Sequence, residues 1–438
     1  MTATVDTDPV LGLNDDAVHA YLSQVLASLG SLTGGGSQVD AGVRIDRITV
    51  LEKIKAAAAA VQAAEIVKFA HTQVAEHKNA GVHPRRVGRG IAEQLGLATK
   101  TGPWHGARRL TLARDLWFDL PATYALLGEG EISEYVAQLV ATETNHLDPE
   151  LRRHVDQQLV DAGLDQMGPK QAAATARKLA YQADPAGSLD RVRTARKDRR
   201  VTCRPAPDTM SLLNALLPVE QGVACYAALK THTDNVKASG DDRSRDQIMA
   251  DTLVERLTGQ TTADQINTEI NLIMPLDTLL QPGRPTTAES PAESPAEIPG
   301  YGPIPGWLAR QLAISNGPAR RWWRRLFTTP THDGGVMIVG GDPTRRRFDG
   351  WLGKLITLRD QTCREPYCTA PIRHLDHVTP YRDGGLTNYS NGRGVCERHN
   401  YTRDMPGWQL ELLSNRPHTP ITITPTGHSH HSRAPNPP

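Results

Sequence analysis

The sequence predicts a mainly α-helical N-terminal domain with a small β-sheet, then a C-terminal α+β module, with disordered termini. From Ile45 to about Leu179, apolar residues recur at helical spacing among strong helix formers. A proline-rich stretch, QPGRPTTAESPAESPAEIPGYGP, then separates this part from shorter alternating segments. Three of the five cysteines lie close together beyond it. We therefore expect two differently built regions joined by a linker.

Length and composition narrow the class of protein. A chain of 438 residues is long enough for two or three domains. With 49 Lys and Arg against 48 Asp and Glu, any surface for nucleic acid must be local. No secretory signal and no apolar stretch of about 20 residues is visible, so we expect a cytoplasmic protein without a membrane segment. The sequence does not indicate an oligomeric state.

The shifts in composition divide the chain into six predicted segments. These are a flexible N-terminus (1–40), a helical domain (41–280), a Pro-rich linker (281–300), a helix with a β-hairpin (301–350), a C-terminal module (351–412) and a disordered tail (413–438). Within the helical domain, RRVTCRPAPDTMSLLNALLP predicts a hairpin and INTEINLIMPL a strand. The later hairpin is expected to turn at Asp333-Gly334-Gly335.

Two basic segments are candidates for contact with nucleic acid. IAEQLGLATKTGPWHGARRL has the rhythm of a helix-turn-helix with Gly96 in the turn, although ordinary helix pairs share it and are the favoured interpretation. Between 320 and 347, arginines alternate with tryptophan and phenylalanine, as on a phosphate-tracking surface. Its last members, Arg345, Arg346 and Arg347, are predicted to contact DNA. The alternative is a solvated hairpin whose tryptophans form a core.

Spacing among the cysteines predicts a metal site. Cys363 and Cys368 are separated by four residues, and Cys396 and His399 by two. Such pairs place two ligands on adjacent vertices of a tetrahedron, which is the geometry of structural zinc. A closed site with four protein ligands stabilises a fold but performs no chemistry. We therefore predict a structural Zn²⁺ at these four residues.

The segment between the two pairs of zinc ligands predicts a second site, with a catalytic role. RHLDHVTP alternates like a strand, so Asp376 and His377 would point to opposite faces. Asn400 would lie in the first turns of a following helix, giving a strand–turn–strand–helix (ββα) unit. Carboxylate and amide oxygens suit a hard divalent ion, so Asp376 and Asn400 are expected to hold Mg²⁺ or Mn²⁺. His377 would then act as a general base on water, and Asn391 would hydrogen-bond the loop or the histidine. This layout is typical of phosphodiester hydrolysis assisted by one metal ion.

Arginines on the expected helix complete the hypothesis. Arg398 and Arg403 follow Cys396 within two helical turns. Guanidinium groups form paired hydrogen bonds with phosphate oxygens, so both are predicted to bind nucleic acid.

The string LDHVTPYRDGGLTNYSNGRGVCERHNYTRD, framed by CREPYC, resembles the HNH (ββα-metal) endonucleases. The resemblance matches His377, Asn391 and Asn400 to the three named positions, and Asp376 to the metal ligand beside the base. The chain has Asp-His where many members have His-His, and Asn at the last position; both variants occur in active members. His399 adjoins Asn400, so either residue could take the last position.

The wider chain resembles the actinobacterial 13E12-repeat proteins, which carry an N-terminal domain of unknown function 222. The resemblance is carried by the helical region, the Pro-rich joint, GYGPIPGWLAR, RRWWRRLFTTPTHDGG and the HNH-like string. It implies no biochemical role for the helices.

Two functions follow as expectations. The first is a divalent-metal-dependent endonuclease that hydrolyses DNA, with RNA as an alternative substrate. The second is a non-catalytic, zinc-braced DNA-binding protein on a degenerate HNH fold.

Overall fold

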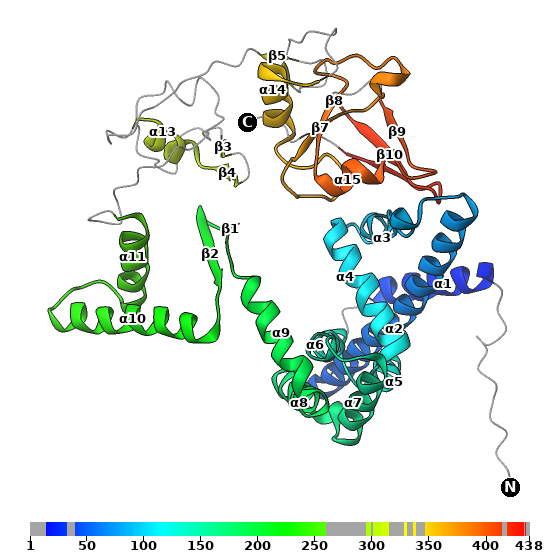
Figure 1. Ribbon diagram of the computed structural model, residues 1–438, viewed down its shortest axis with the longest axis vertical. Coiled ribbons are helices and arrows are strands. Elements are labelled where there is room, and N and C mark those ends of the chain that lie inside the picture. The colour runs from blue at the N-terminus through cyan, green and yellow to red at the C-terminus, as the bar shows by residue number, and fades with distance from the viewer. Residues whose placement is uncertain are drawn as a thin grey trace.

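The computed structural model of the chain shows a helical N-terminal bundle, an extended arm and a C-terminal module (Figure 1). The structure describes residues 15–32, 40–259, 295–298, 301–314, 328–330, 336–338, 347–413, 418–432 and 434. The predicted strand at 266–276, most of the expected linker, and the tryptophans and most arginines of the 320–347 strip lie outside these residues. In the described part of the chain, no helix is both long enough and apolar enough to span a bilayer.

The N-terminal region is mainly helical, as the periodicity predicts. Its helices are α1 (Asp15–Ser31), α2 (Ala41–Asn79), η2 (Pro84–Arg86), α3 (Ile91–Ala98), α4 (Pro103–Arg114), η3 (Asp115–Asp119), α5 (Pro121–Gly128), α6 (Glu134–Thr144), α7 (Pro149–Asp161), η4 (Leu164–Gln166), α8 (Pro169–Ala183) and α9 (Pro185–Lys197). Several begin with a proline in the first turn, where its missing N–H and fixed φ carry no penalty. Asp148 and Ser133 accept backbone hydrogen bonds at the starts of α7 and α6.

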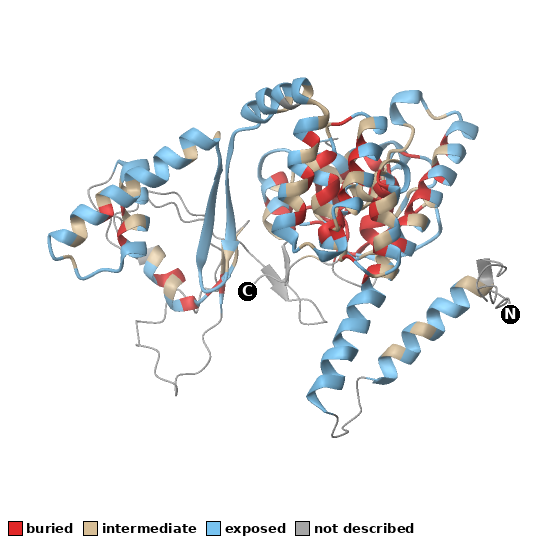
Figure 2. Ribbon diagram, turned by 90° about the horizontal axis from the view of Figure 1, so that it is seen from below, coloured by how far each residue is buried: buried red, intermediate tan, exposed pale blue. Residues whose placement is uncertain are grey.

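Small side chains let these helices approach closely. One buried apolar cluster joins α2 to α5, α6, α7 and α8, and much of it is alanine. Figure 2 shows the buried residues concentrated in this bundle. At the crossing of α3 and α4, a Cβ on Gly106 would lie 2.0 Å from the carbonyl oxygen of Ala92. Only glycine fits there.

The predicted helix-turn-helix differs from the structure in its turn. Gly96 lies inside α3, not in the turn, because α3 continues to Ala98 and the chain reverses only before Pro103. A Cβ on Gly96 would lie 2.9 Å from the carbonyl oxygen of Thr101. Gly96 therefore permits close packing of the turn against the helix rather than forming the turn itself.

A two-stranded arm follows the bundle. Strands β1 (Arg200–Ala206) and β2 (Met210–Leu216) pair antiparallel, as the alternation predicts, with Arg200 opposite Leu216. Helices α10 (Val219–Ala238) and α11 (Arg245–Thr258) continue the chain. A capping box at Ser244 and Gln247 starts α11.

The described C-terminal region contains short strands and three α-helices. Its elements are β3 (Ala296–Ile298), β4 (Gly302–Ile304), α13 (Gly306–Ile314), β5 (Thr328–Pro330), β6 (Val336–Ile338), α14 (Gly350–Asp360), β7 (His374–His377), η5 (Tyr381–Asp383), β8 (Gly392–Val395), α15 (Glu397–Thr402), β9 (Gln409–Leu412), β10 (Pro420–Ile423) and β11 (Ser429–His431). β5 pairs with β6, so the predicted hairpin has its strands, while its turn lies outside the described residues. β7 pairs antiparallel with β8, with Asp376 opposite Arg393.

Two expectations about the termini differ from the structure. Residues Asp15–Ser31 of the expected flexible N-terminus form α1, because leucines and alanines recur there at helical spacing. In the expected disordered tail, β10 and β11 join β9 in a three-stranded sheet. The proline and histidine content of the tail suggested disorder, but ITIT alternates and buries Thr422.

Candidate metal centre and its surroundings

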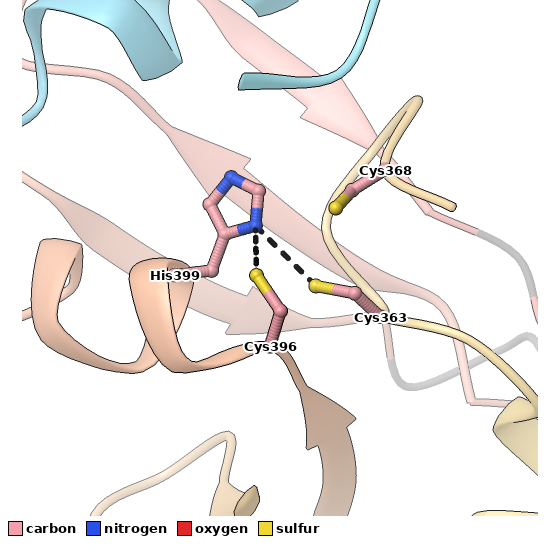
Figure 3. A group of neighbouring side chains, drawn as sticks. All are labelled: Cys363, Cys368, Cys396 and His399. Carbon is pink, nitrogen blue, oxygen red and sulfur yellow. Dashed lines mark hydrogen bonds between the residues drawn. The ribbon is translucent and has the colours of Figure 1, made fainter. Parts of the chain in front are cut away.

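Three cysteines and one histidine converge in the C-terminal module. Cys363 and Cys368 lie on the loop after α14, Cys396 is the N-cap residue of α15, and His399 lies in that helix. All four are buried, and their ligand atoms lie within 4.8 Å of one another. Figure 3 shows the side chains pointing toward a common centre.

The geometry of this cluster suits zinc. His399 Nδ1 lies 3.3 Å from Cys363 Sγ and 3.3 Å from Cys396 Sγ. Zn–N and Zn–S bonds of about 2.0 and 2.3 Å place nitrogen and sulfur roughly 3.5 Å apart on a tetrahedron. Three thiolates and one imidazole fill four positions, so such an ion would be structural. His399 thus belongs with the cysteines, which leaves Asn400 as the candidate for the last HNH position.

Backbone hydrogen bonds shape the loop that carries the first two cysteines. The N–H of Cys363 donates to the carbonyl of Ala370 at 2.9 Å, and that of Arg364 donates to Gly394 of β8 at 2.8 Å. Tyr367 has φ 61°, in the left-handed region that closes tight turns. The loop therefore folds back on itself and is attached to β8.

Proximity shifts the pKa values of Cys363, Cys396 and His399. Hydrogen bonds with Cys368 and Cys396, together with burial, raise the pKa of Cys363. Hydrogen bonds with Cys363 and Cys368, joined by His399, hold the pKa of Cys396 far below its usual range. Burial opposes a charge on His399, but hydrogen bonds with Cys368 and Cys396 outweigh it and raise its pKa to about 10. A thiolate is therefore favoured at Cys396 even before a cation is present, which suits a soft divalent metal.

A buried ionic chain lies beside the cluster. Arg393 on β8 is fully buried and donates to Glu365 at 2.6 Å and to Asp376 at 3.4 Å. Burial opposes the charge on Glu365, but Arg393 more than compensates and lowers its pKa. Thr422 of β10 donates to the same carboxylate at 2.7 Å. These buried ion pairs and hydrogen bonds link the cysteine loop, both strands of the hairpin and the C-terminal sheet.

Sequence reasoning missed Arg393 and Glu365, although a signal for Arg393 exists. Arg393 stands between two glycines, and Cβ atoms on Gly392 and Gly394 would lie 2.4 Å from Ile356 and Ile372. The glycines keep one face of β8 flat against α14 and the cysteine loop. The arginine takes the opposite face, where its charge must find buried partners.

His377 is fixed at the end of β7. Its Nε2 lies 2.8 Å from the hydroxyl of Thr387, and its ring lies 4.3 Å from that of Phe348, centre to centre. The ring of Tyr381 is 5.9 Å away on another side. The imidazole is buried and held by groups from three parts of the module.

Asn391 fixes the turn that carries these groups. Its side-chain oxygen accepts from the N–H of Thr379 at 2.8 Å, and its amide donates to the carbonyls of Thr379 and Leu386 at 3.0 and 2.8 Å. Asn391 is thus a loop-positioning residue. Of the two partners expected for it, the structure shows the loop.

Asp376 has cationic neighbours. One carboxylate oxygen accepts from the N–H of His377 at 2.9 Å, and the other accepts from Arg393 and Arg403. Arg403 also donates to the carbonyl of His377. Asn400 lies half-buried in α15. It and Asp376 carry the kind of oxygen that Mg²⁺ prefers, but a divalent ion at Asp376 would compete with Arg393 and Arg403.

The predicted phosphate-binding arginines have different surroundings. Arg403 is mostly buried against Asp376, and Arg398 forms an ion pair with Glu93 of α3. Arg347 is exposed, whereas Arg345 and Arg346 lie outside the described residues. In this conformation the guanidinium groups of Arg398 and Arg403 are bound within the chain.

A comparison with family models adds an independent observation about the helical region. Residues 48–271, half of the chain, match the model described as Domain of unknown function (DUF222). The chain belongs to the DUF222 family. No curated protein and no solved structure matches it. The DUF222 match ends before the C-terminal module, so the HNH resemblance of that module rests on its own residues.

The DUF222 domain lies against the C-terminal module through α3 (Figure 1). The carboxylate of Glu93 is 2% exposed and pairs with Arg398, which stands between Cys396 and His399 in α15. Thr426 donates to Gln94 at 3.2 Å. The cysteine cluster therefore holds the helix that presents Arg398 to the DUF222 domain.

Proposed function

We propose that residues 347–432 form an HNH-type module that hydrolyses phosphodiester bonds in DNA with a divalent metal ion. One observation carries the proposal. His377 lies beside Asp376 at the end of a β-hairpin, and a Cys₃His cluster joins the helix after that hairpin to the loop before it. The imidazole and the carboxylate supply the two groups that this hydrolysis needs, a base for water and a ligand for the divalent ion.

His377 is the proposed general base. The hydroxyl of Thr387 and the ring of Phe348 restrict its imidazole to one orientation. A fixed ring transfers a proton from water without first losing conformational freedom, and such catalysis contributes about 10²- to 10⁴-fold in rate. Asn391 acts indirectly by holding the turn between Thr379 and Leu386.

Asp376 and Asn400 would hold the divalent ion, which supplies charge stabilisation at the leaving oxygen when bound. Arg403 occupies one oxygen of Asp376 in the present conformation. We propose that Arg403 turns from Asp376 toward a phosphate when substrate arrives. Its guanidinium group then exchanges one anionic partner for another.

A second candidate is a DNA-binding module without catalysis. Two guanidinium groups neutralise Asp376, and His377 is buried between aromatic rings. Both features are compatible with a purely structural ion pair and a core histidine. This candidate predicts binding without cleavage.

A plasmid-nicking assay separates the two candidates. Supercoiled plasmid is incubated with the zinc-loaded full chain and Mg²⁺ or Mn²⁺, and His377→Ala is compared with wild type. We expect the variant to nick at least about 100-fold more slowly, as for loss of a general base. His154→Ala is the matched control, because His154 is an exposed histidine on α7, and it should retain the wild-type rate.

Equal nicking by wild type and His377→Ala would refute catalysis by this module. If neither protein nicks but both retard DNA, the binding candidate replaces the nuclease. Zinc content measured on each sample shows whether a variant has kept its fold.

A further inference from the structure

A basic turn of the DUF222 domain lies beside α15. Arg89 follows η2, and its guanidinium carbon is 5.5 Å from the centre of the Tyr401 ring. Gly90, with φ 94°, is so close to Trp408 that a Cβ would lie 2.9 Å from the indole nitrogen. The ion pair between Glu93 and Arg398 continues this contact one turn further along α3. The turn is therefore held in place against the module.

Tyr401 connects this turn to the proposed catalytic strand. Its side chain is 44% exposed although Arg89 lies over its ring. The ring of His374 on β7 is 6.2 Å away. His374 and Asp376 are two residues apart on one strand, so they share a face. A continuous path thus leads from Arg89 through Tyr401 and His374 to Asp376.

The arginines before Arg89 are open to solvent. Arg85 and Arg86 form η2, and both are exposed. Within the described residues, neither takes part in an ion pair. Glu397 and Asp404, near the two ends of α15, are exposed as well and would repel phosphate. Cations from the DUF222 domain would offset these carboxylates and add to the attraction of this side of the module for a phosphate backbone.

We propose that Arg85, Arg86 and Arg89 of the DUF222 domain, together with Tyr401, form a DNA-binding surface across the junction of the two regions. This proposal rests on the proposed function, since it assigns further contacts to the same DNA. The arginines bind phosphates, which fixes the position of the strand without reading its sequence. Tyr401 offers an exposed ring on which a base or sugar packs. The DUF222 domain then has a biochemical role: it extends the DNA-binding surface of the module.

Salt dependence of binding tests the surface directly. Binding of a fluorescent DNA duplex to the zinc-loaded full chain is measured by anisotropy, without Mg²⁺, over a range of NaCl concentrations. Each phosphate contact contributes about 0.9 to the slope of log K against log salt. For Arg85→Ala/Arg86→Ala we expect the slope to fall by about 1.8 and affinity at low salt to fall at least about tenfold. Tyr401→Ala should weaken binding several-fold with an unchanged slope, and Tyr401→Phe should restore it.

The matched control removes equal charge elsewhere. Lys170→Ala/Lys178→Ala deletes two exposed cations from α8 and should leave both slope and affinity unchanged. Equal losses in the two double variants would show that net charge alone matters, and would overturn the proposal. An unchanged slope in Arg85→Ala/Arg86→Ala, or absence of wild-type binding to duplex, would overturn it as well. A preference for an RNA duplex with the same loss of slope would retain the surface and exclude DNA as its partner.

The nicking assay distinguishes failure of the DNA-binding surface from failure of the proposed catalytic function. If the arginine variant binds poorly while His377→Ala nicks like wild type, the surface stands and the catalytic role of His377 falls. If His377→Ala is inactive while the arginine variant binds normally, the catalytic role stands and the surface falls.

Discussion

The DUF222 domain and the C-terminal module are stabilised by different kinds of interaction. The core of the DUF222 domain is a continuous apolar cluster from five or more helices, rich in alanine. The apolar cluster around the cysteines consists of Cys363, Cys368, Cys396 and Val395, with Ala370 packed against it. Around it lie buried charges, including Arg393 and Glu365. One region gains stability from removal of apolar surface from water, and the other has charge pairing and a Cys₃His cluster that could hold a structural metal.

This difference determines which substitutions should destabilise each region. Apolar contacts are many and individually weak, so loss of one is tolerated. A metal site and a buried ion pair depend on every member, because an unpaired buried charge costs far more than a lost methyl group. Single polar substitutions should therefore damage the module and spare the helices.

Cys363→Ser gives the largest expected effect. Loss of a zinc thiolate removes most of a binding free energy that reaches about 10–16 kcal/mol in small zinc domains, so the module should unfold. Metal analysis should show loss of the one zinc per chain, and far-UV circular dichroism should show the helices of the DUF222 domain intact. Cys203→Ser is the control, because Cys203 is exposed on β1, and it should keep both zinc and fold. Retention of zinc by Cys363→Ser would contradict the cluster.

Arg393→Met tests the role of charge pairing in the module, because it removes the ion pairs of Arg393 with Glu365 and Asp376. Glu365 and Asp376 would lose their shared partner, and breaking such a pair costs about 3–5 kcal/mol. Urea unfolding of the module, followed by zinc release, should shift to lower concentration. The double variant Arg393→Met/Glu365→Gln should regain part of the loss. A single variant as stable as wild type would show that water already reaches these charges.

Glu93→Gln tests the contact between the two regions. Arg398 is 42% exposed, so solvent screens the pair and the expected loss is about 1 kcal/mol or less. Hydrogen exchange in α3 should rise while exchange in α6 stays constant. Lys55→Ala, which breaks the exposed pair with Glu52, should change neither. Unchanged exchange in α3 would mean that the pair contributes nothing to docking.

The smallest effect is a pH dependence in the DUF222 domain. Hydrogen bonding from Arg177 lowers the pKa of Glu143 below its usual value of 4.5. A lowered folded-state pKa means that Glu143 contributes stability above pH 4.5, which is lost as pH falls through the folded-state value. Wild type should therefore exceed Glu143→Gln in urea midpoint at pH 7, and the difference should shrink below pH 4. A constant difference across this range would refute the assignment.

Sequence reasoning reached the mainly helical N-terminal region and the Cys₃His cluster because both are local in pattern. Helical periodicity can be recognised within a short run of residues. The spacing within the pairs Cys363–Cys368 and Cys396–His399 is one that lets both side chains bind one tetrahedral ion. The order of the tail could not be predicted this way. Its strands are stable because β10 pairs with β9, and because Thr422 reaches Glu365, far earlier in the chain.

The contacts of the candidate catalytic residues could not be predicted from the sequence either. Nothing local to Arg403 or Arg398 indicates that one would bind Asp376 and the other would bind Glu93, more than two hundred residues away. Such pairings depend on tertiary contacts. The expectation that these arginines face phosphate remains a prediction, and the nicking and binding assays above test it.

Hydrogen exchange of the full chain with and without a zinc chelator tests the central contrast most directly. Chelation is expected to raise exchange in β7, β8 and α15 to that of an unfolded chain, while α6 and α8 of the DUF222 domain keep their protection. Equal loss of protection in both regions, or no change in the module, would contradict it.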